Sequence, residues 1–106
     1  MLNTNLTGQM KDIPDKFTRE GIDYTLIMRH GNVAAVYEGC RNGFVREYEV
    51  WKLRVYKKDN PSYGITSGDI HKPSTKEWGR YGWTYGSMSS ANDKYIQLID
   101  SHELSD

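Results

Sequence analysis

The chain has 106 residues, which is enough for one small domain and too few for two self-sufficient cores. Hydrophobic residues make up only 37% of it, but eight tyrosines, three tryptophans and two phenylalanines exclude a disordered tail and favour an aromatic-rich β protein. The formal net charge is zero, which argues against an acidic mimic of DNA and against strong non-specific binding to nucleic acid.

The sequence shows no signal for secretion or for membrane anchoring. Its first ten residues, MLNTNLTGQM, lack the basic start and apolar core of a signal peptide, and no apolar run approaches membrane-spanning length. The single cysteine, Cys40, cannot form an intramolecular disulfide. We therefore expect a reduced, cytoplasmic setting and no contact with a membrane.

The predicted domain organisation is one folded unit between two loose ends. Residues 1–16 are polar and have no sustained hydrophobic period, which is typical of a loose leader. Residues 101–106 follow the last periodic segment and predict a frayed terminus. We expect a single α+β domain over 17–100, with a long loop at 58–73.

The first half of this domain is predicted to be antiparallel strands joined by turns. A short strand over 17–19 ends at a glycine turn, and a second strand follows over 22–29. The apolar side chains of the second strand alternate and are expected to share one face: Ile22, Tyr24, Leu26 and Met28. The next predicted strand is 32–40, and its residues 33–37 are apolar on both faces, as in a strand at the middle of a sheet or under a helix. Asn42-Gly43 then predicts a hairpin, because both central residues of a type I′ turn need positive φ.

The next predicted strand, 44–57, is the longest. Its apolar residues are Tyr48 and Val50 on one face and Trp51, Leu53 and Val55 on the other. This change predicts either a β-bulge or a strand whose two halves pack on different layers. The complementary positions are charged and predict a solvated side: Glu47, Glu49, Lys52 and Arg54.

The second half of the domain is predicted to be a loop, a strand and a helix. Proline and glycine punctuate 58–73, and so long a loop in a small domain is often functional or mobile. Ser74 to Glu77 matches a capping box and predicts one helical turn before a strand at 83–85. Apolar residues then recur at spacings of three and four, which predicts a helix capped by a serine at 87, 89 or 90. The predicted stripe is Met88, Ala91, Tyr95 and Leu98, widened by Ile96 and Ile99.

These elements predict an α+β fold, an antiparallel meander of about four to five strands with one C-terminal helix packed on one face. The sequence has no nucleophile-elbow motif, no phosphate-binding glycine loop and no histidine pair at zinc spacing, so we expect no enzyme, cofactor or metal. Two pairs were weighed as chemical sites, Cys40 with His30 and Asp69 with His71. We prefer ordinary structural roles for both, because a lone cysteine in an apolar strand is usually a small hydrophobe and the second pair has no third ligand.

The aromatic segment KEWGRYGWTYG, residues 76–86, is the strongest candidate for a binding surface. One strand cannot bury both faces of so many rings, and an exposed aromatic beside arginine is typical of a protein-binding hot spot. We expect Trp83 to be a core residue and the contact surface to combine this segment with the long loop. The candidate contact residues are Trp78, Arg80, Tyr81, Tyr63, Asp69 and His71.

The string Trp78-Gly79-Arg80-Tyr81-Gly82 resembles the WGR domain, a small β-sheet-plus-helix module of DNA-end-responsive polymerases. The resemblance covers about 76–96 and implies an alternative function, a nucleic-acid-binding module. Trp51, Tyr81 and Trp83 would then stack on bases. The residues expected to contact phosphates are Arg46, Arg54, Lys57 and Arg80.

A longer resemblance, over 17–98, is to short uncharacterised proteins encoded in phage and prophage-like regions. It rests on GIDYTLIMRHGNVAAVYE, YEVWKLRV, EWGRYGWTY and ANDKY in that order. It brings no activity and implies only a context, a small accessory factor in the cytoplasm of a bacterial host. Our hypothesis is a non-catalytic binding protein that modulates a host protein or defence system by protein–protein contact. The sequence leaves the oligomeric state open.

Overall fold

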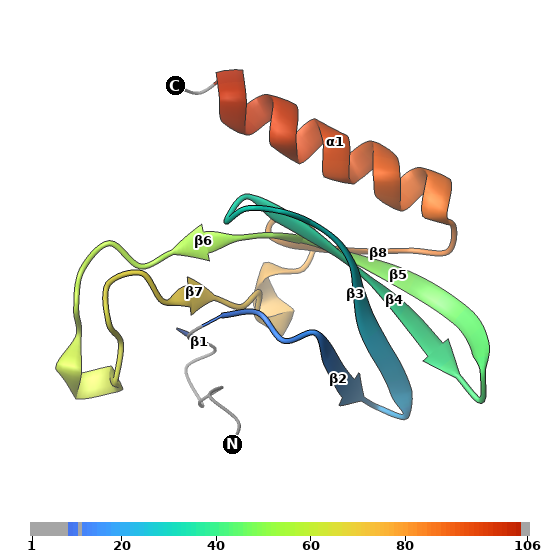
Figure 1. Ribbon diagram of the computed structural model, residues 1–106, viewed down its shortest axis with the longest axis horizontal. Helices are drawn as coiled ribbons and strands as arrows, with labels where there is room; N and C mark the ends of the chain where they lie inside the picture. The colour runs from blue at the N-terminus through green and yellow to red at the C-terminus, as the bar shows by residue number, and fades with distance from the viewer. Residues whose placement is uncertain (1–8, 11, 105–106) are drawn as a thin grey trace.

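The computed structural model describes residues 9–10 and 12–104, so most of the predicted leader and the last two residues of the predicted frayed end lie outside it. The fold is an antiparallel five-stranded sheet with one C-terminal helix packed on it, which confirms the predicted α+β class (Figure 1). The order in this sheet is β2 (Lys16–Arg19), β3 (Ile22–His30), β4 (Ala34–Arg41), β5 (Phe44–Lys52) and β8 (Gly82–Tyr85). A second, three-stranded sheet has the order β1 (Gln9–Met10), β7 (Ile70–His71) and β6 (Arg54–Val55). The helix, α1, spans Met88–Leu104.

Each face of the large sheet carries its own hydrophobic core. The helix-side core is formed by Ala34, Val36, Val50, Ala91 and Leu98. The opposite core, which we call the inner core, lies between the two sheets and is formed by Ile13, Tyr24, Ala35, Tyr37, Trp51, Leu53 and Ile70. Strand β4 is central and contributes to both cores, as its apolar residues predict. The hairpin between β4 and β5 is also confirmed, because Asn42 and Gly43 both have positive φ, 53° and 82°.

From Glu47 onward strand β5 alternates strictly, and its two faces pack on different layers. Tyr48 and Val50 pack with the helix-side core, whereas Trp51 belongs to the inner core. The one-residue register shift lies earlier, opposite Gly39 and Cys40, so no bulge divides the two apolar groups. After Lys52 the chain leaves the large sheet and β6 joins the small one, which ends the long strand predicted to reach 57.

Two features of the N-terminal half differ from the sequence-based expectation. The register of β3 against β4 shifts between Leu26 and Met28, so Met28 packs with the helix-side core and not with the three residues expected on its face. The residues just before β2 are not loose. Ile13 is buried in the inner core, and the hydroxyl of Tyr37 donates a hydrogen bond of 2.7 Å to the carbonyl of Pro14.

The segment predicted as a loop, 58–73, is also held against the rest of the fold by two buried isoleucine side chains. Ile65 and Ile70 are buried, and a short 3-10 helix, η1 (Pro61–Tyr63), lies between β6 and β7. At the other end of the chain, α1 continues through 101–104, where fraying was expected. Ser87 is its cap, since its hydroxyl accepts a 3.2 Å hydrogen bond from the amide of Ser90. Ile96 is 47% exposed and is not part of the buried stripe.

Candidate functional site

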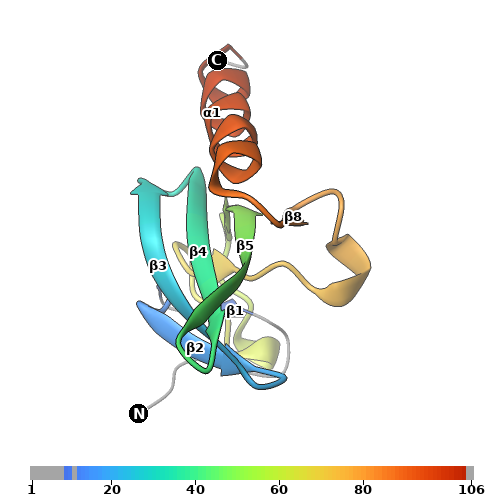
Figure 2. The ribbon, with the colours of Figure 1, turned by 90° about the vertical axis from the view of Figure 1, so that its right-hand side faces the viewer.

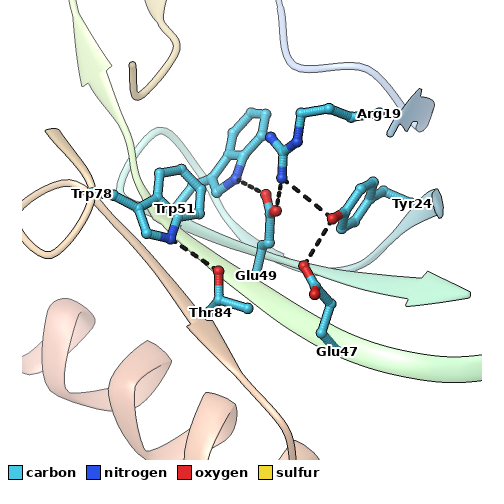
Figure 3. Close-up of polar contacts among 7 residues, drawn as sticks. All are labelled: Arg19, Tyr24, Glu47, Glu49, Trp51, Trp78 and Thr84. Atoms are coloured by element: carbon cyan, nitrogen blue, oxygen red, sulfur yellow. Dashed lines mark hydrogen bonds and ion pairs between the residues drawn. The ribbon is translucent and has the colours of Figure 1, made fainter. Parts of the chain in front are cut away.

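The aromatic segment is held in place by a capped turn. In the 3-10 helix η2 (Thr75–Glu77), the amide of Ser74 donates to the Glu77 carboxylate at 3.0 Å, as the capping box predicts. Trp78 then folds back over β8. Its indole N–H donates to the hydroxyl of Thr84 at 2.9 Å (Figure 3), and its ring lies so close to Gly82 that an added Cβ there would be 2.5 Å from it. Trp78 is therefore a half-buried, fixed ring.

Tyr81 is surrounded by three cations. The guanidinium carbon of Arg54 lies 3.7 Å from the centroid of the Tyr81 ring, that of Arg80 lies at 5.3 Å, and the Lys52 ammonium lies at 5.7 Å. The backbone fixes this arrangement, because the amide of Lys52 donates to the carbonyl of Tyr81 at 2.9 Å. The ring face attracts cations, and the ring itself is half-buried. We call Lys52, Arg54, Arg80 and Tyr81 the Tyr81 surface.

The Tyr81 surface carries excess positive charge. Arg54 forms a 2.8 Å ion pair with Glu77, so its charge is balanced. Burial opposes ionisation of Glu77, but the hydrogen bond from Ser74 and the Arg54 guanidinium together lower the pKa of its carboxyl. Within residues 9–10 and 12–104, Lys52 and Arg80 have no carboxylate partner. This surface is therefore suited to an acidic group.

His71 adjoins the Tyr81 surface through Glu77, the ion-pair partner of Arg54. The imidazole stacks on Tyr56 with ring centroids 5.2 Å apart, and its Nε2 lies 3.8 Å from Glu77. Burial and the Arg54 charge lower the pKa of His71, and Glu77 opposes them. Asp69 is 3% exposed and accepts a hydrogen bond from the amide of Thr66, so it fixes a turn. It cannot be the surface contact that the sequence suggested.

The other sequence-predicted contact residues are dispersed. Trp78, Arg80 and Tyr81 are neighbours, as expected, and Arg80 is exposed. Tyr63 is 60% exposed, but it lies in η1, in the segment that connects β6 and β7 and away from β8 (Figure 1). Trp83 is half-buried against the helix-side core, with the Lys94 ammonium 4.1 Å from its ring centroid, so it is less enclosed than expected.

The residues proposed for nucleic-acid binding do not form one surface. Trp51 is 1% exposed and cannot stack on a base. Arg54 and Arg80 flank Tyr81, and Lys57 is exposed beyond β6. Arg46 belongs to the far hairpin between β4 and β5 (Figure 2).

A buried polar network beneath the aromatic segment was not predicted. Glu49, expected on a solvated face, is fully buried, and it forms an ion pair with Arg19 from the edge strand β2 (Figure 3). The indole N–H of Trp51 donates to the second carboxylate oxygen at 3.1 Å. Strict alternation along β5 was the available signal, because it places Glu49 on the face of Trp51.

Arg19 also connects this network to the aromatic segment. Its guanidinium carbon lies 5.0 Å from the Tyr24 ring centroid and 5.8 Å from those of Phe17 and Trp78. The hydroxyl of Tyr24 donates to Glu47 at 2.8 Å, and burial together with that carboxylate raises the pKa of Tyr24 to about 12. The ring of Trp78 is therefore supported from below by a charged and aromatic layer.

The residues considered for chemistry, Cys40 and His30, lie apart. Cys40 pairs with Asp23 and His30 with Ala34, at opposite ends of the β3–β4 hairpin, so the pair weighed from the sequence does not form. Burial and the nearby carboxylate of Glu38 raise the pKa of Cys40, which disfavours the thiolate. No group of three or more histidine, cysteine or acidic residues is arranged to hold a metal among the residues that the structure describes.

Two further observations concern the surface. A hollow of about 100 Å³ lies where the end of α1 meets the sheet, and it is too small for most ligands. It is lined by Val33, Lys52, Leu53, Leu98, Ser101 and His102. Within the described ranges, no helix is both long enough and apolar enough to cross a membrane.

Comparisons with protein-family models, with curated proteins and with solved structures each returned no match.

Proposed function

We propose that this chain is a non-catalytic protein-binding module that contacts an acidic partner through the Tyr81 surface. The observation that carries the proposal is the half-buried Tyr81 ring with three cations within 5.7 Å of its centroid, two of which have no carboxylate partner among the described residues. Tyrosine and arginine are enriched at binding hot spots because each combines apolar area with polar groups. A partner that supplies carboxylates and an apolar side chain would satisfy this surface.

The rigidity of the surface supports the same proposal. Tyr81 is fixed through the backbone bond to Lys52, and its neighbour Trp78 is fixed through Thr84 and Gly82. A preorganised surface loses less conformational entropy on binding than a mobile one. The partner that we propose is a bacterial host protein, and the chain would act as a phage-derived accessory factor in the cytoplasm. This context rests on the resemblance of residues 17–98 to short phage and prophage proteins.

The test is affinity capture from bacterial lysate with matched charge variants. Arg80→Glu reverses an exposed charge on the Tyr81 surface and should abolish capture of the partner. Arg41→Glu makes the same charge change at the β4–β5 hairpin, where the side chain is exposed, and should leave capture unchanged. If Arg80→Glu captures the same proteins as the wild type, or if both variants lose them equally, the proposal is wrong.

Single-strand nucleic-acid binding is the second candidate, and one observation favours it. The guanidinium groups of Arg54 and Arg80 both flank the Tyr81 ring, an arrangement that suits base stacking beside phosphates. The burial of Trp51 leaves one fewer ring for this purpose. Binding of a fluorescent single strand, weakening steeply as salt rises and lost in Tyr81→Ala, would favour this candidate over protein binding.

A further inference from the structure

The outward side of α1 carries acidic and aliphatic residues in one stripe. The exposed members lie at spacings of three, four and seven and therefore share one helix face: Asp93, Ile96, Asp100, Glu103 and Leu104. Ile96 is 47% exposed and Leu104 is 87% exposed. Among the described residues, the three carboxylates of this stripe have no cation partner. The one lysine of α1, Lys94, is turned aside over Trp83 and donates to Gln97.

This stripe is complementary to the Tyr81 surface of the same chain. Asp93 and Asp100 are seven residues apart, which is about 10 Å along a helix, and Ile96 lies between them. On the Tyr81 surface, the charged groups of Lys52 and Arg80 each lie less than 6 Å from the centroid of the Tyr81 ring. Each surface therefore has an apolar centre with two charges of one sign beside it. The charges are negative on the helix stripe and positive on the Tyr81 surface. A contact of this kind brings Ile96 against Tyr81 and places each carboxylate beside a cation.

The two surfaces cannot meet within one molecule. Figure 2 shows α1 above the large sheet and the chain leading into β8 to one side of it, and Ala91 and Leu98 hold the opposite side of α1 against the sheet. The contact therefore needs a second copy. The zero net charge of the chain removes the long-range repulsion that would otherwise oppose association of identical molecules.

We propose that the outward face of α1 docks on the Tyr81 surface of a second copy, giving a head-to-tail association. This inference rests on the proposed function, because it uses the same Tyr81 surface and names one partner for it. The contact joins two different patches, so it need not close at a dimer. It should weaken as salt rises, because the charges of both patches lie at the surface.

Two double variants separate the patches. Ile96→Ser with Asp100→Asn removes the helix face and leaves the Tyr81 surface intact. Lys52→Ala with Arg80→Ala removes the two cations of the Tyr81 surface that have no carboxylate partner among the described residues, and it leaves the helix face intact. All four positions are exposed, so both variants should fold like the wild type, which thermal melting checks.

Sedimentation velocity over rising protein concentration, at low and high salt, is the experiment. We expect the wild type to pass beyond a dimer at low salt and to dissociate at high salt, and each double variant to remain monomeric. An equimolar mixture of the two variants has one intact pair of patches and should form a dimer and nothing larger.

Two results would overturn the proposal: a wild type that stays monomeric, or a mixture that behaves like the separate variants. Partner capture by the Ile96→Ser, Asp100→Asn variant distinguishes failure of the head-to-tail contact from failure of the proposed function. If that variant still captures a host protein while the wild type does not self-associate, only the head-to-tail contact is wrong. If neither self-association nor capture occurs, both proposals fail.

Discussion

Replacement of Arg19 by methionine removes the only cation paired with Glu49 among the described residues and keeps most of the aliphatic volume of the side chain. Glu49 is fully buried, whereas the Arg19 side chain is 38% exposed. Loss of one partner of a buried pair costs about 3–5 kcal/mol, because the remaining charge is buried without compensation. Since water can reach the position of Arg19, we expect the lower end, about 3 kcal/mol. In a domain of this size that lowers the melting temperature by about 12 °C or more.

The assay is unfolding by heat and by urea, followed by circular dichroism. Arg46→Met is the matched control, because Arg46 is exposed and its replacement should cost no more than about 0.5 kcal/mol. A second variant, Arg19→Met with Glu49→Gln, removes the buried charge and keeps an oxygen for the indole of Trp51, so it should recover part of the loss. Methylguanidinium, well below denaturing concentrations, should stabilise Arg19→Met and not the double variant.

Two results would refute this reasoning. If Arg19→Met unfolds like the wild type, Glu49 does not depend on the guanidinium. If the double variant is as unstable as Arg19→Met, the loss comes from packing of the Arg19 stem against Tyr24 and Phe17 and not from the unpaired charge.

Three further predictions test other parts of the site. The pKa of His71 is lowered in the folded state, so folding favours the neutral ring. The stability that depends on the neutral ring should be full above about pH 6.5 and should fall as the pH drops below it. Measured free energies of unfolding should fall less across this range in His71→Asn than in the wild type. Gly82→Ala should destabilise the protein by about 1–3 kcal/mol, because its Cβ would meet the Trp78 ring at 2.5 Å, and tryptophan fluorescence should change; an unchanged melting curve would contradict this. Trp83→Ala should cost about 2–3 kcal/mol, less than a fully buried tryptophan would, while Arg80→Ala should melt like the wild type.

The local elements were predictable because their signals are short-range. Asn42-Gly43 specifies its hairpin through backbone conformation alone, and the spacing of Ala91 and Leu98 specifies which side of α1 faces the sheet. The capping box at Ser74 and Glu77 is equally local. None of these features depends on what the distant parts of the chain do.

The second layer of the fold was not predictable in the same way. Glu49 was assigned to a solvated face because a charged residue in an alternating strand usually faces water. Its face is covered by Arg19, which lies 30 residues earlier in the chain, and by the small sheet. Ile13 and Ile70 close the same core from segments whose composition is that of loops. Such long-range pairings leave no periodic signal in either segment.

The candidate site was only partly predictable, because some of its residues are brought together by long-range strand pairing. Arg80 and Tyr81 are adjacent in sequence to the aromatic segment, so composition alone indicated them. Lys52 and Arg54 flank the same ring only because β5 pairs with β8, a partnership that the sequence does not specify. The sequence places Lys52 and Arg54 on a solvated side and makes Arg54 a candidate phosphate contact, and neither prediction brings them to Tyr81.

The position of Trp78 determines how far binding and stability can be separated in this protein. Its ring contacts Gly82 and Thr84 of β8 on one side and lies beside Arg19, the partner of Glu49, on the other. A change at Trp78 therefore disturbs both the turn that presents Tyr81 and the layer that covers the buried carboxylate. Arg80 makes no such contact with the inner core, and its side chain is exposed. Loss of binding through Trp78 would be ambiguous, whereas loss through Arg80 in a folded protein would identify the surface.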